Sequence, residues 1–278
     1  MKADLHMHST YSDGFLTTKE LFERAHKNNV DLISITDHDI VKNVDENYQY
    51  AKEYGVKYVP GIELSTVMKG KPVHVLGYFT DDSYKSKEIL DYFQEIKEKR
   101  EQRAKKFIAN LDEFFGIKIT YKSVLSFSKG IIARPHIAKA INEVYPHYKH
   151  DYIFDHFIGD TSRAYVPSCE LSVQEGINLL RRNNCLVVLA HPTLLKNYIK
   201  DDVLEMDFDG IEAKYFRNKD NDEEIFRELA SKRQMFITGG GDFHGIPNDT
   251  KHGDIGQVYI DGNDFDNFIK RLSTKSIN

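Results

Sequence analysis

The first residues that could do chemistry lie near the N-terminus, in the segment DLHMHSTYSDG that spans residues 4–14. His6 and His8 are two positions apart, and on a strand such residues point to the same side. Two imidazoles on one strand face can hold one cation. Asp13 follows in the tripeptide SDG, which is typical of a turn. The histidine pair alone is equally compatible with an ordinary polar strand and loop, so the argument depends on the rest of the chain.

Further ligand-type residues follow predicted strands. The run DLISITDHD predicts a short strand followed by His38, and CLVVLAHP predicts a buried strand that ends at His191. The run MFITGGGDFHG predicts a strand that leads into Asp242 and His244. In a parallel α/β barrel the C-terminal ends of the strands form one face, where active sites lie. We therefore expect these side chains to converge in space.

Two strand-like runs, GIELSTVM and KPVHVLGYF, are joined at Lys69-Gly70 and predict a hairpin. A turn centred there places Ser65 opposite His74. It also places Glu63 diagonally from His74 on the same face, within reach of its side chain. A slip of one residue in the register would separate the two.

Taken together, six histidines and three carboxylates at such positions predict a metal site. Without a cation they would leave unpaired polar and charged groups in a confined space, which is costly. Mixed nitrogen and oxygen ligands suit Zn, Mn or Fe, and the absence of thiolates argues against a structural zinc. Nine ligands are too many for one ion, so we expect two or three divalent ions, with a carboxylate such as Glu63 bridging. The predicted ligands are His6, His8, Asp13, His38, Glu63, His74, His191, Asp242 and His244.

The elements that position these residues alternate between strands and helices. Helical patterns at LTTKELFERAHKNNV and from Val44 to Tyr54 follow the first strands, and a final strand is expected at GQVYID. This βα rhythm predicts an α/β fold with parallel strands. Between residues 81 and 184 the apolar residues recur at helix spacing instead. We predict a barrel domain formed by residues 1–80 and 185–278, interrupted by a helical insertion at 81–184.

The insertion carries two features of interest. The run KEKREQRAKK is either a nucleic-acid contact or the solvated side of a long helix, and its interleaved acidic residues favour the solvated side. The segment ARPHIAKAI predicts a helix with Pro135 at its first position, and the start of a helix offers free backbone N–H groups that can bind an anion. Arg134 lies immediately before this predicted helix and could bind a phosphate. From local sequence alone, an ordinary surface arginine is equally open.

The composition limits the broad class of protein to which the chain can belong. A net charge of −5 argues against a protein that coats nucleic acid. Cys169 and Cys185 form neither a disulfide framework nor a zinc pattern, and we expect both as reduced thiols in a cytoplasmic protein. No apolar run is long enough to cross a bilayer, and the N-terminal residues lack the apolar stretch of a secretion signal. No feature points to an obligate protein partner.

The motifs DLHMHSTYSDG, ITDHD, PGIELS, HVLGY, LAHP and GGGDFHG resemble, in this order, those of the PHP superfamily, named for polymerase and histidinol phosphatase. The spacing and the ARPHIAKA segment resemble its stand-alone nucleotide phosphoesterase branch. The resemblance implies a distorted seven-stranded, TIM-like βα barrel with a trinuclear metal site. It also implies that Arg134 grips the substrate phosphate and neutralises charge on the phosphoryl oxygens.

The resemblance further assigns the ligands to three ions. The first ion would take His6, His8, Glu63 and Asp242; the second would share Glu63 and add His74 and His191; the third would take Asp13, His38 and His244. Glu212 is interpreted either as a residue that orients a ligand histidine or as an ordinary polar strand end. His136 could face the site but is not counted among its residues. Turn, supporting or salt-bridge roles are expected for Asp4, Asp37 and Asp39.

The leading hypothesis is a metal-dependent phosphoesterase in which a metal hydroxide attacks phosphorus. The expected substrate is a small phosphorylated molecule, a nucleoside monophosphate or a 3′,5′-bisphosphate nucleotide. A 5′-to-3′ exoribonuclease acting on short RNA and a histidinol-phosphate phosphatase remain alternatives. An amidohydrolase would leave Asp13, Glu63 and His74 unexplained. A non-catalytic metal-stabilised module would not explain why the set of predicted ligands is complete.

Overall fold

The computed structural model describes residues 1–167 and 171–275, so that Cys169 lies outside the described residues, whereas Cys185 is buried. The described strands form two sheets. The smaller is parallel, with the order β1 (Ala3–Asp4), β2 (Leu32–Ile33) and β3 (Lys57–Tyr58). The larger has five strands in sequence order: β4 (Gly61–Met68), β5 (Lys71–Phe79), β6 (Cys185–Leu189), β7 (Gly210–Tyr215) and β8 (Phe236–Gly240).

Strand direction in the larger sheet changes along its width. β5 pairs antiparallel with both β4 and β6, whereas β6, β7 and β8 are parallel. The predicted hairpin is confirmed in its register, since Met68 pairs with Lys71 and Ser65 with His74. Lys69 and Gly70 both have positive φ angles, 49° and 75°, as expected for the tight turns that suit the twist of a hairpin.

Backbone hydrogen bonds join the two sheets on both sides. Beyond β1, the amide of Leu5 donates to Gly239 O (3.1 Å). Beyond β2, the amide of Asp39 donates to Glu63 O (3.0 Å). The α/β class is therefore confirmed. The prediction of a final strand at GQVYID is wrong, because residues 256–261 make only isolated bridges. Ile260 pairs with Ala3 and Val258 pairs with Ile255, and the chain turns after each of these short contacts.

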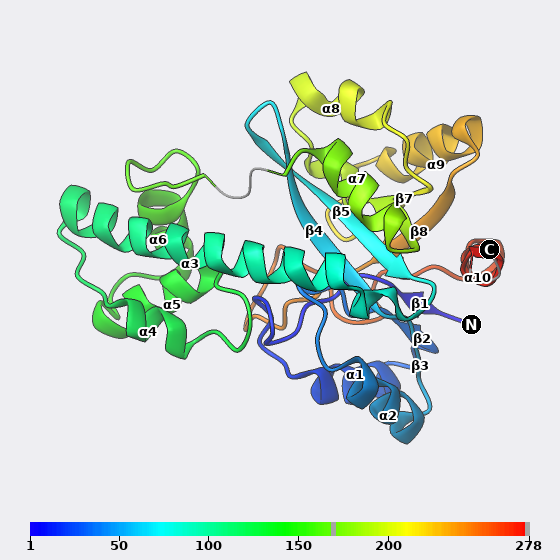
Figure 1. The fold of residues 1–278 in the computed structure, drawn as a ribbon, viewed down its shortest axis with the longest axis horizontal. Helices are drawn as coiled ribbons and strands as arrows, with labels where there is room; N and C mark the ends of the chain where they lie inside the picture. Colours follow the sequence, from blue (N-terminus) through cyan, green and yellow to red (C-terminus); the bar gives the residue numbers. More distant parts are fainter. Residues whose placement is uncertain (168–170, 276–278) are drawn as a thin grey trace.

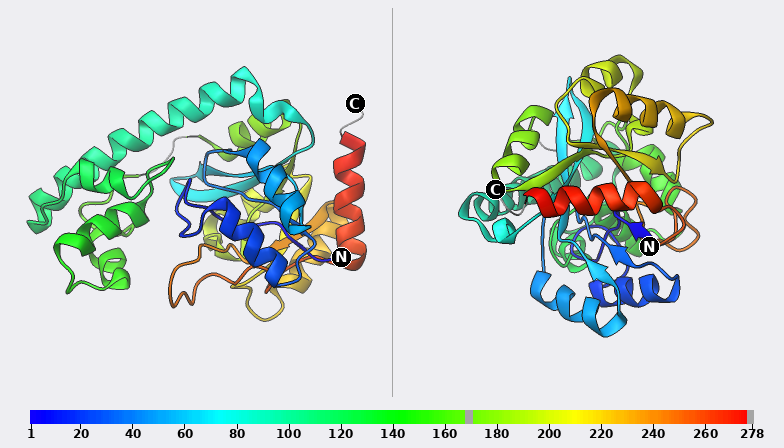
Figure 2. Two further views of the ribbon diagram at one scale, coloured as in Figure 1. Left: turned by 90° about the horizontal axis from the view of Figure 1, so that it is seen from below. Right: turned by 90° about the vertical axis from the view of Figure 1, so that its right-hand side faces the viewer.

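Helices pack on the outer faces of the sheets (Figures 1 and 2). α1 (Thr18–Lys27) and α2 (Val44–Tyr54) lie beside the smaller sheet, and α7 (Val173–Arg182), α8 (Asn197–Leu204) and α9 (Asp222–Arg233) lie beside the larger one. α10 (Gly262–Lys275) lies at the end where the N-terminus is found. Short 3₁₀ turns occur at η1 (Asp82–Lys85) and η3 (Pro192–Leu194).

A second group of helices extends to one side of the sheets. It comprises α3 (Lys87–Phe115), α4 (Tyr121–Ser126), α5 (Arg134–Val144), α6 (His150–Ile153) and the π-helical turn η2 (Phe154–Ile158). These helices enclose a separate hydrophobic cluster that includes Phe107, Leu111 and Ile141. The start of α3 is packed differently, since Ile89 and Phe93 belong to the main core. α3 therefore runs from the main core to this second cluster, as Figure 2 shows.

Among the helices in the described part of the chain, none is both long and apolar enough to cross a membrane.

Candidate metal centre

Glycines allow the chain to bring the first histidines against the last strand. His6 and His8 follow β1 directly, and a Cβ at Gly240 would lie only 2.5 Å from the Cβ of His6. Only glycine therefore lets β8 approach His6 so closely. A Cβ at Gly14 would lie 2.2 Å from His8 O, so the turn after Asp13 also requires glycine. These contacts place Asp13 and His8 beside the end of β8.

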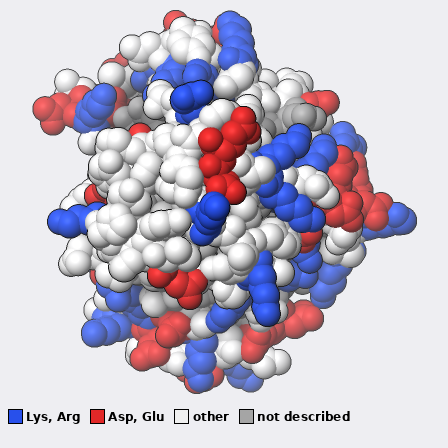
Figure 3. All heavy atoms as spheres, turned by 90° about the vertical axis from the view of Figure 1, so that its left-hand side faces the viewer, with Lys and Arg blue, Asp and Glu red and all other residues white. Residues whose placement is uncertain are grey.

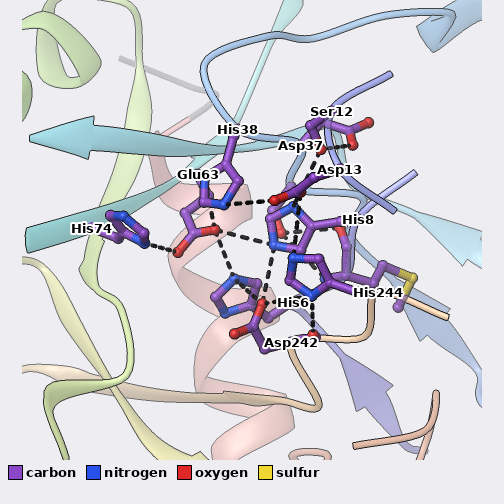
Figure 4. Close-up of polar contacts among 12 residues, drawn as sticks. His6, His8, Ser12, Asp13, Asp37, His38, Glu63, His74, Asp242 and His244 are labelled. Carbon is purple, nitrogen blue, oxygen red and sulfur yellow. Dashed lines mark hydrogen bonds and ion pairs between the residues drawn. The ribbon is translucent and has the colours of Figure 1, made fainter. Parts of the chain in front are cut away.

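Glu63, on β4, lies at the middle of the cluster (Figure 4). One carboxylate oxygen, Oε1, hydrogen-bonds His74 Nδ1 at 2.8 Å and His191 Nε2 at 2.9 Å. The other oxygen faces three further histidines. Oε2 lies 3.3 Å from His6 Nε2, 3.1 Å from His8 Nε2 and 3.2 Å from His38 Nδ1.

Asp242 completes the first group that the sequence predicts. Its Oδ1 lies 3.4 Å from His6 Nε2 and 3.1 Å from His8 Nε2. Two ligand atoms that are about 2.1 Å from one ion, at angles of about 90–110°, are separated by about 3.0–3.4 Å. The spacing of His6, His8, Glu63 and Asp242 is therefore the spacing of ligands around one ion.

Asp13 organises the third predicted group. Its Oδ1 lies 3.3 Å from His244 Nε2, and its Oδ2 lies 3.8 Å from His38 Nε2. His8 also approaches this group, because its Nδ1 lies 3.7 Å from Asp13 Oδ1. The structure thus brings the predicted ligands together, His191 through its contact with Glu63, and places His8 between two of the groups.

The polar atoms of the cluster fit a group of cations. His6 Nε2, Asp13 Oδ1 and His38 Nδ1 are buried and have no hydrogen bond to the described residues, although each lies near an oppositely charged partner. Buried polar atoms without hydrogen bonds are costly unless another group satisfies them. Imidazole and carboxylate ligands match the preferences of Zn, Mn and Fe. The donor set therefore fits a centre of more than one divalent ion.

The electrostatics of the protein without metal agree with this fit. Burial would raise the pKa of Glu63, but His38, His74 and His6 hold that pKa well below its ordinary value. Burial would likewise raise the pKa of Asp242, and His6 and His244 hold it well below the ordinary value. Both carboxylates are therefore ionised and ready to bind cations at neutral pH.

Glu212, on β7, orients two of the histidines. Its Oε1 hydrogen-bonds His6 Nδ1 at 2.9 Å, which leaves His6 Nε2 directed at the cluster. Its Oε2 accepts the backbone N–H of His191 at 2.7 Å and holds that residue at a positive φ of 27°. Of the two interpretations offered by the sequence, the supporting role is the one that the geometry matches.

We expect Glu212→Gln to lower metal affinity and kcat/KM by about 10–100-fold, because carboxylates that orient ligand histidines contribute on that scale. Metal content after gel filtration and steady-state kinetics would measure the change. Glu175→Gln is the matched control, since Glu175 is exposed and serves only the cap of α7. Equal metal affinity in the Glu212 and control variants would contradict the assignment.

Several neighbouring polar residues support the fold rather than the ions. Asp37 accepts hydrogen bonds from Ser9 and Ser12 and so fixes the turn before Asp13. Asp4 accepts the backbone N–H groups of residues 241 and 256. His136 is buried, and its Nδ1 accepts the N–H of Ala133 at the start of α5.

Seven of the predicted ligands line a cavity of about 610 Å³ and form its floor: Asp13, His38, Glu63, His74, His191, Asp242 and His244. Arg100, Arg103 and Arg134 line the wall that the second group of helices contributes. The interpretation of the KEKREQRAKK segment as a solvated face is therefore wrong for Arg100 and Arg103. The acidic residues of this segment, Glu98 and Glu101, are not among those that line the cavity. The Arg100 side chain is only 10% exposed and bonds Asp39 and Ser65. A spacing of three residues places both arginines on one side of α3.

One residue at the cluster was missed. His252 lies in the loop after β8, with its Nε2 3.8 Å from Asp242 Oδ2 and its ring centroid 4.2 Å from that of His244. It does not end a strand, and no spacing in the sequence relates it to the predicted ligands. Only the fold of the 246–252 loop could have shown its position.

Comparison with known proteins identifies the family. The model of the PHP domain matches residues 4–239. The chain belongs to the PHP family. The Haemophilus influenzae 5′-3′ exoribonuclease is 27% identical over 251 residues, which cover 87% of this chain and 90% of that protein. The 3′,5′-nucleoside bisphosphate phosphatase of Chromobacterium violaceum is 26% identical over 87% of this chain and 86% of that protein.

A solved structure shares the fold and the family chemistry. It is described as a metal-dependent phosphoesterase from Bifidobacterium adolescentis, with a TM-score of 0.84 and 27% identity over 97% of this chain and 96% of that one. With the buried His/Asp/Glu clusters, these matches make the PHP chain a metal-dependent phosphoesterase.

Proposed function

We propose that this PHP enzyme hydrolyses phosphate monoesters of nucleotides, either a nucleoside monophosphate or a 3′,5′-bisphosphate nucleotide. The observation that carries the proposal is one cavity with a cluster of metal-ligand residues on its floor and three arginines on its wall. A phosphoryl group bound between them would face positive charge from both sides. The phosphatase from Chromobacterium violaceum supports this substrate class.

The ligand assignment forms part of the proposal. His6, His8, Glu63 and Asp242 would hold one ion, Glu63, His74 and His191 a second, and Asp13, His38 and His244 a third. When bound, such ions, whether Mn, Fe or Zn, activate water near neutral pH and neutralise phosphoryl oxygens.

The chain's own groups position the reaction. The hydroxyl of Tyr215 donates to Asp242 Oδ2 at 3.0 Å, and Glu212 holds His6, so that both ligands are fixed before substrate binds. Arg134 and Arg103 hold the phosphate against the floor of the cavity. Pre-positioned groups of this kind need no rearrangement as charge develops in the transition state.

The charges of the arginine wall favour an anionic ligand. Arg103 is half-buried; its Nε donates to Val166 O (2.8 Å), and its guanidinium packs over Phe107 and Tyr165. Burial and the neighbouring Arg100 and Arg134 lower the pKa of Arg103 to about 10. A phosphate placed between these groups would relieve the repulsion among them.

Arg134→Ala is expected to lower kcat/KM for nucleotide substrates by about 10–100-fold, since a charged hydrogen bond contributes about 1.5–3 kcal/mol. Most of the loss should appear in KM, and Arg134→Lys should restore part of it. Arg163→Ala is the matched control, because Arg163 is an exposed arginine of the same region that packs over Phe114. Unchanged kinetics for Arg134→Ala would assign Arg134 solely to its ion pair with Asp160 (2.6 Å).

Exonucleolytic attack on short RNA is a second candidate. Aromatic rings of Phe154 and Tyr165 and the ammonium group of Lys149 also line the cavity, and such groups bind bases and phosphates of single strands. The exoribonuclease of Haemophilus influenzae supports this candidate. On the outer face of the second helix group, basic and acidic side chains are intermixed rather than arranged in a basic stripe (Figure 3). That pattern favours a short RNA over a long one.

Phosphate release by the purified protein tests the proposal. Metal-free protein would be reloaded separately with Mn, Fe and Zn and assayed on AMP, a 3′,5′-bisphosphate nucleotide, histidinol phosphate and a 5′-phosphorylated oligonucleotide. Metal-dependent release of phosphate that is lost in His191→Ala supports the proposal. The preferred substrate then shows which of the candidate activities the enzyme has. No release from any nucleotide by metal-loaded protein would overturn it.

We also propose how the two sheets and the helices divide into domains. The two sheets, of three and five strands, are joined by backbone hydrogen bonds on both sides and would form one distorted barrel. This barrel would have eight strands where the resemblance implies seven. Residues 1–80 and 185–278 would make this barrel domain and residues 81–184 the inserted domain. The separate hydrophobic cluster of the second helix group supports the division, although α7 packs with the main core.

A further inference from the structure

We propose that His252 supplies a further nitrogen ligand to the ion of the Asp13–His38–His244 group, with Asp249 as the carboxylate that orients it. The proposal rests on the metal centre proposed above and adds a residue that the predicted ligand set lacks. It assigns a function to the 246–252 loop, which also lines the cavity.

The first argument concerns which nitrogen of His252 is available. Asp249 Oδ2 lies 2.6 Å from His252 Nδ1, so the Nδ1–H donates to this carboxylate. The other carboxylate oxygen of Asp249 accepts the backbone N–H of Lys251 at 2.7 Å, which fixes the loop. With its Nδ1 engaged in this way, His252 presents the lone pair of Nε2. Ligand histidines are commonly held by a carboxylate on the opposite ring nitrogen, and Glu212 holds His6 in the same manner.

The second argument concerns where this lone pair lies. His252 Nε2 is 3.8 Å from Asp242 Oδ2, whereas Asp242 Oδ1 faces His6 and His8. Two atoms that are each about 2.1 Å from one ion can be at most about 4.2 Å apart. The distance therefore allows Asp242 Oδ2 to reach the ion that His252 would bind, while Asp242 Oδ1 serves the first ion.

The third argument identifies the ion. Asp242, His244 and His252 each offer a ligand atom within 4.8 Å of the others. His244 Nδ1 donates to Asp242 O at 2.7 Å, so His244 binds through Nε2, the atom that lies 3.3 Å from Asp13 Oδ1. The rings of His252 and His244 lie 4.2 Å apart, so His252 borders the ion that His244 and Asp13 would hold. Its side chain is 21% exposed and reaches this position from the cavity side.

Metal binding by the full chain tests the proposal without substrate. Metal-free wild type, His252→Gln and the control His150→Gln, whose histidine lines the same cavity from α6, would be titrated with Co²⁺ and Mn²⁺. We expect His252→Gln to lower the affinity for one ion by about 10–100-fold and to change the visible Co²⁺ spectrum. His150→Gln should match the wild type in both measurements.

A second variant, Asp249→Asn, keeps the imidazole and weakens its orientation, so it should lower the affinity for the same ion to a smaller extent. If His252→Gln does not fold, the titration of Asp249→Asn tests the proposal in its place. Unchanged ion number, affinity and Co²⁺ spectrum in the folded variants would overturn the proposal. Because no substrate enters the titration, this result is independent of whether the enzyme releases phosphate from nucleotides.

Discussion

Glu63→Gln is expected to lower kcat/KM by more than about 100-fold, the largest loss for any single substitution in this protein. Carboxylates that only orient metal ligands contribute about 10–100-fold, and Glu63 contacts the ligand groups of all the proposed ions directly. Glutamine keeps the shape of the side chain but has no charge and offers one oxygen instead of two. Steady-state kinetics on the preferred substrate and metal content after gel filtration would measure the effect.

The same substitution has a consequence for the metal-free protein. His6 and His8 are fully buried, and Glu63 is one of the carboxylates that compensate them. Removing that charge leaves the buried imidazoles of His6 and His8 with fewer compensating carboxylates, which is destabilising. We therefore expect the metal-free Glu63→Gln protein to melt at a lower temperature than the metal-free wild type. Glu20→Gln, at the exposed cap of α1, is the control. A variant that retained a tenth of the activity with its full metal content would contradict the bridging role.

The metal-ligand residues could be predicted because each follows a recognisable strand or turn. His191 ends an apolar run, Asp242 and His244 follow a glycine-rich run, and His74 lies in a hairpin whose turn sets the register. These are local signals, and the convergence of strand ends in an α/β fold turns them into a spatial prediction.

The arginine wall and His252 could not be predicted in the same way. Arg100 and Arg103 lie in a charged helical segment, and which side of that helix faces the cavity depends on how α3 packs against the main core at Ile89 and Phe93. His252 lies in an irregular loop held by Asp249 and by backbone contacts such as Gly253 N to Gly241 O (2.7 Å). Positions of this kind depend on tertiary contacts, which no periodicity in the sequence encodes.

Removal of metal is expected to abolish activity and to lower the melting temperature at neutral pH. Ions that bind only the folded protein stabilise it by mass action, by about 4 kcal/mol for an ion at a thousand times its Kd. Treatment with a chelator, followed by calorimetry and by reloading with each metal, would measure both effects. Recovery on reloading would separate loss of metal from irreversible unfolding. An unchanged melting temperature after verified removal of metal would contradict the proposed centre.

Without metal, stability should also depend on pH in a specific direction. Burial would lower the pKa of His8, but Asp242 and Glu63 outweigh it and raise the pKa to about 10. In the unfolded chain the pKa of a histidine is near 6.5. Between these values the folded protein keeps a proton that the unfolded chain has released, so the free energy of unfolding falls as pH rises. The contribution of His8 is complete below about pH 6.5 and is lost as pH rises towards 10.

The metal-loaded protein should behave in the opposite way over the same range. Ions bind the deprotonated imidazole, so binding releases protons and the affinity for metal rises with pH. From pH 6.5 to 9 we therefore expect the melting temperature of the metal-free protein to fall while the stabilisation by added metal grows. Melting curves with and without metal at each pH would show the two trends diverging. Parallel trends would mean that His8 does not exchange its proton for a metal ion, and the ligand assignment of the first ion would have to be abandoned.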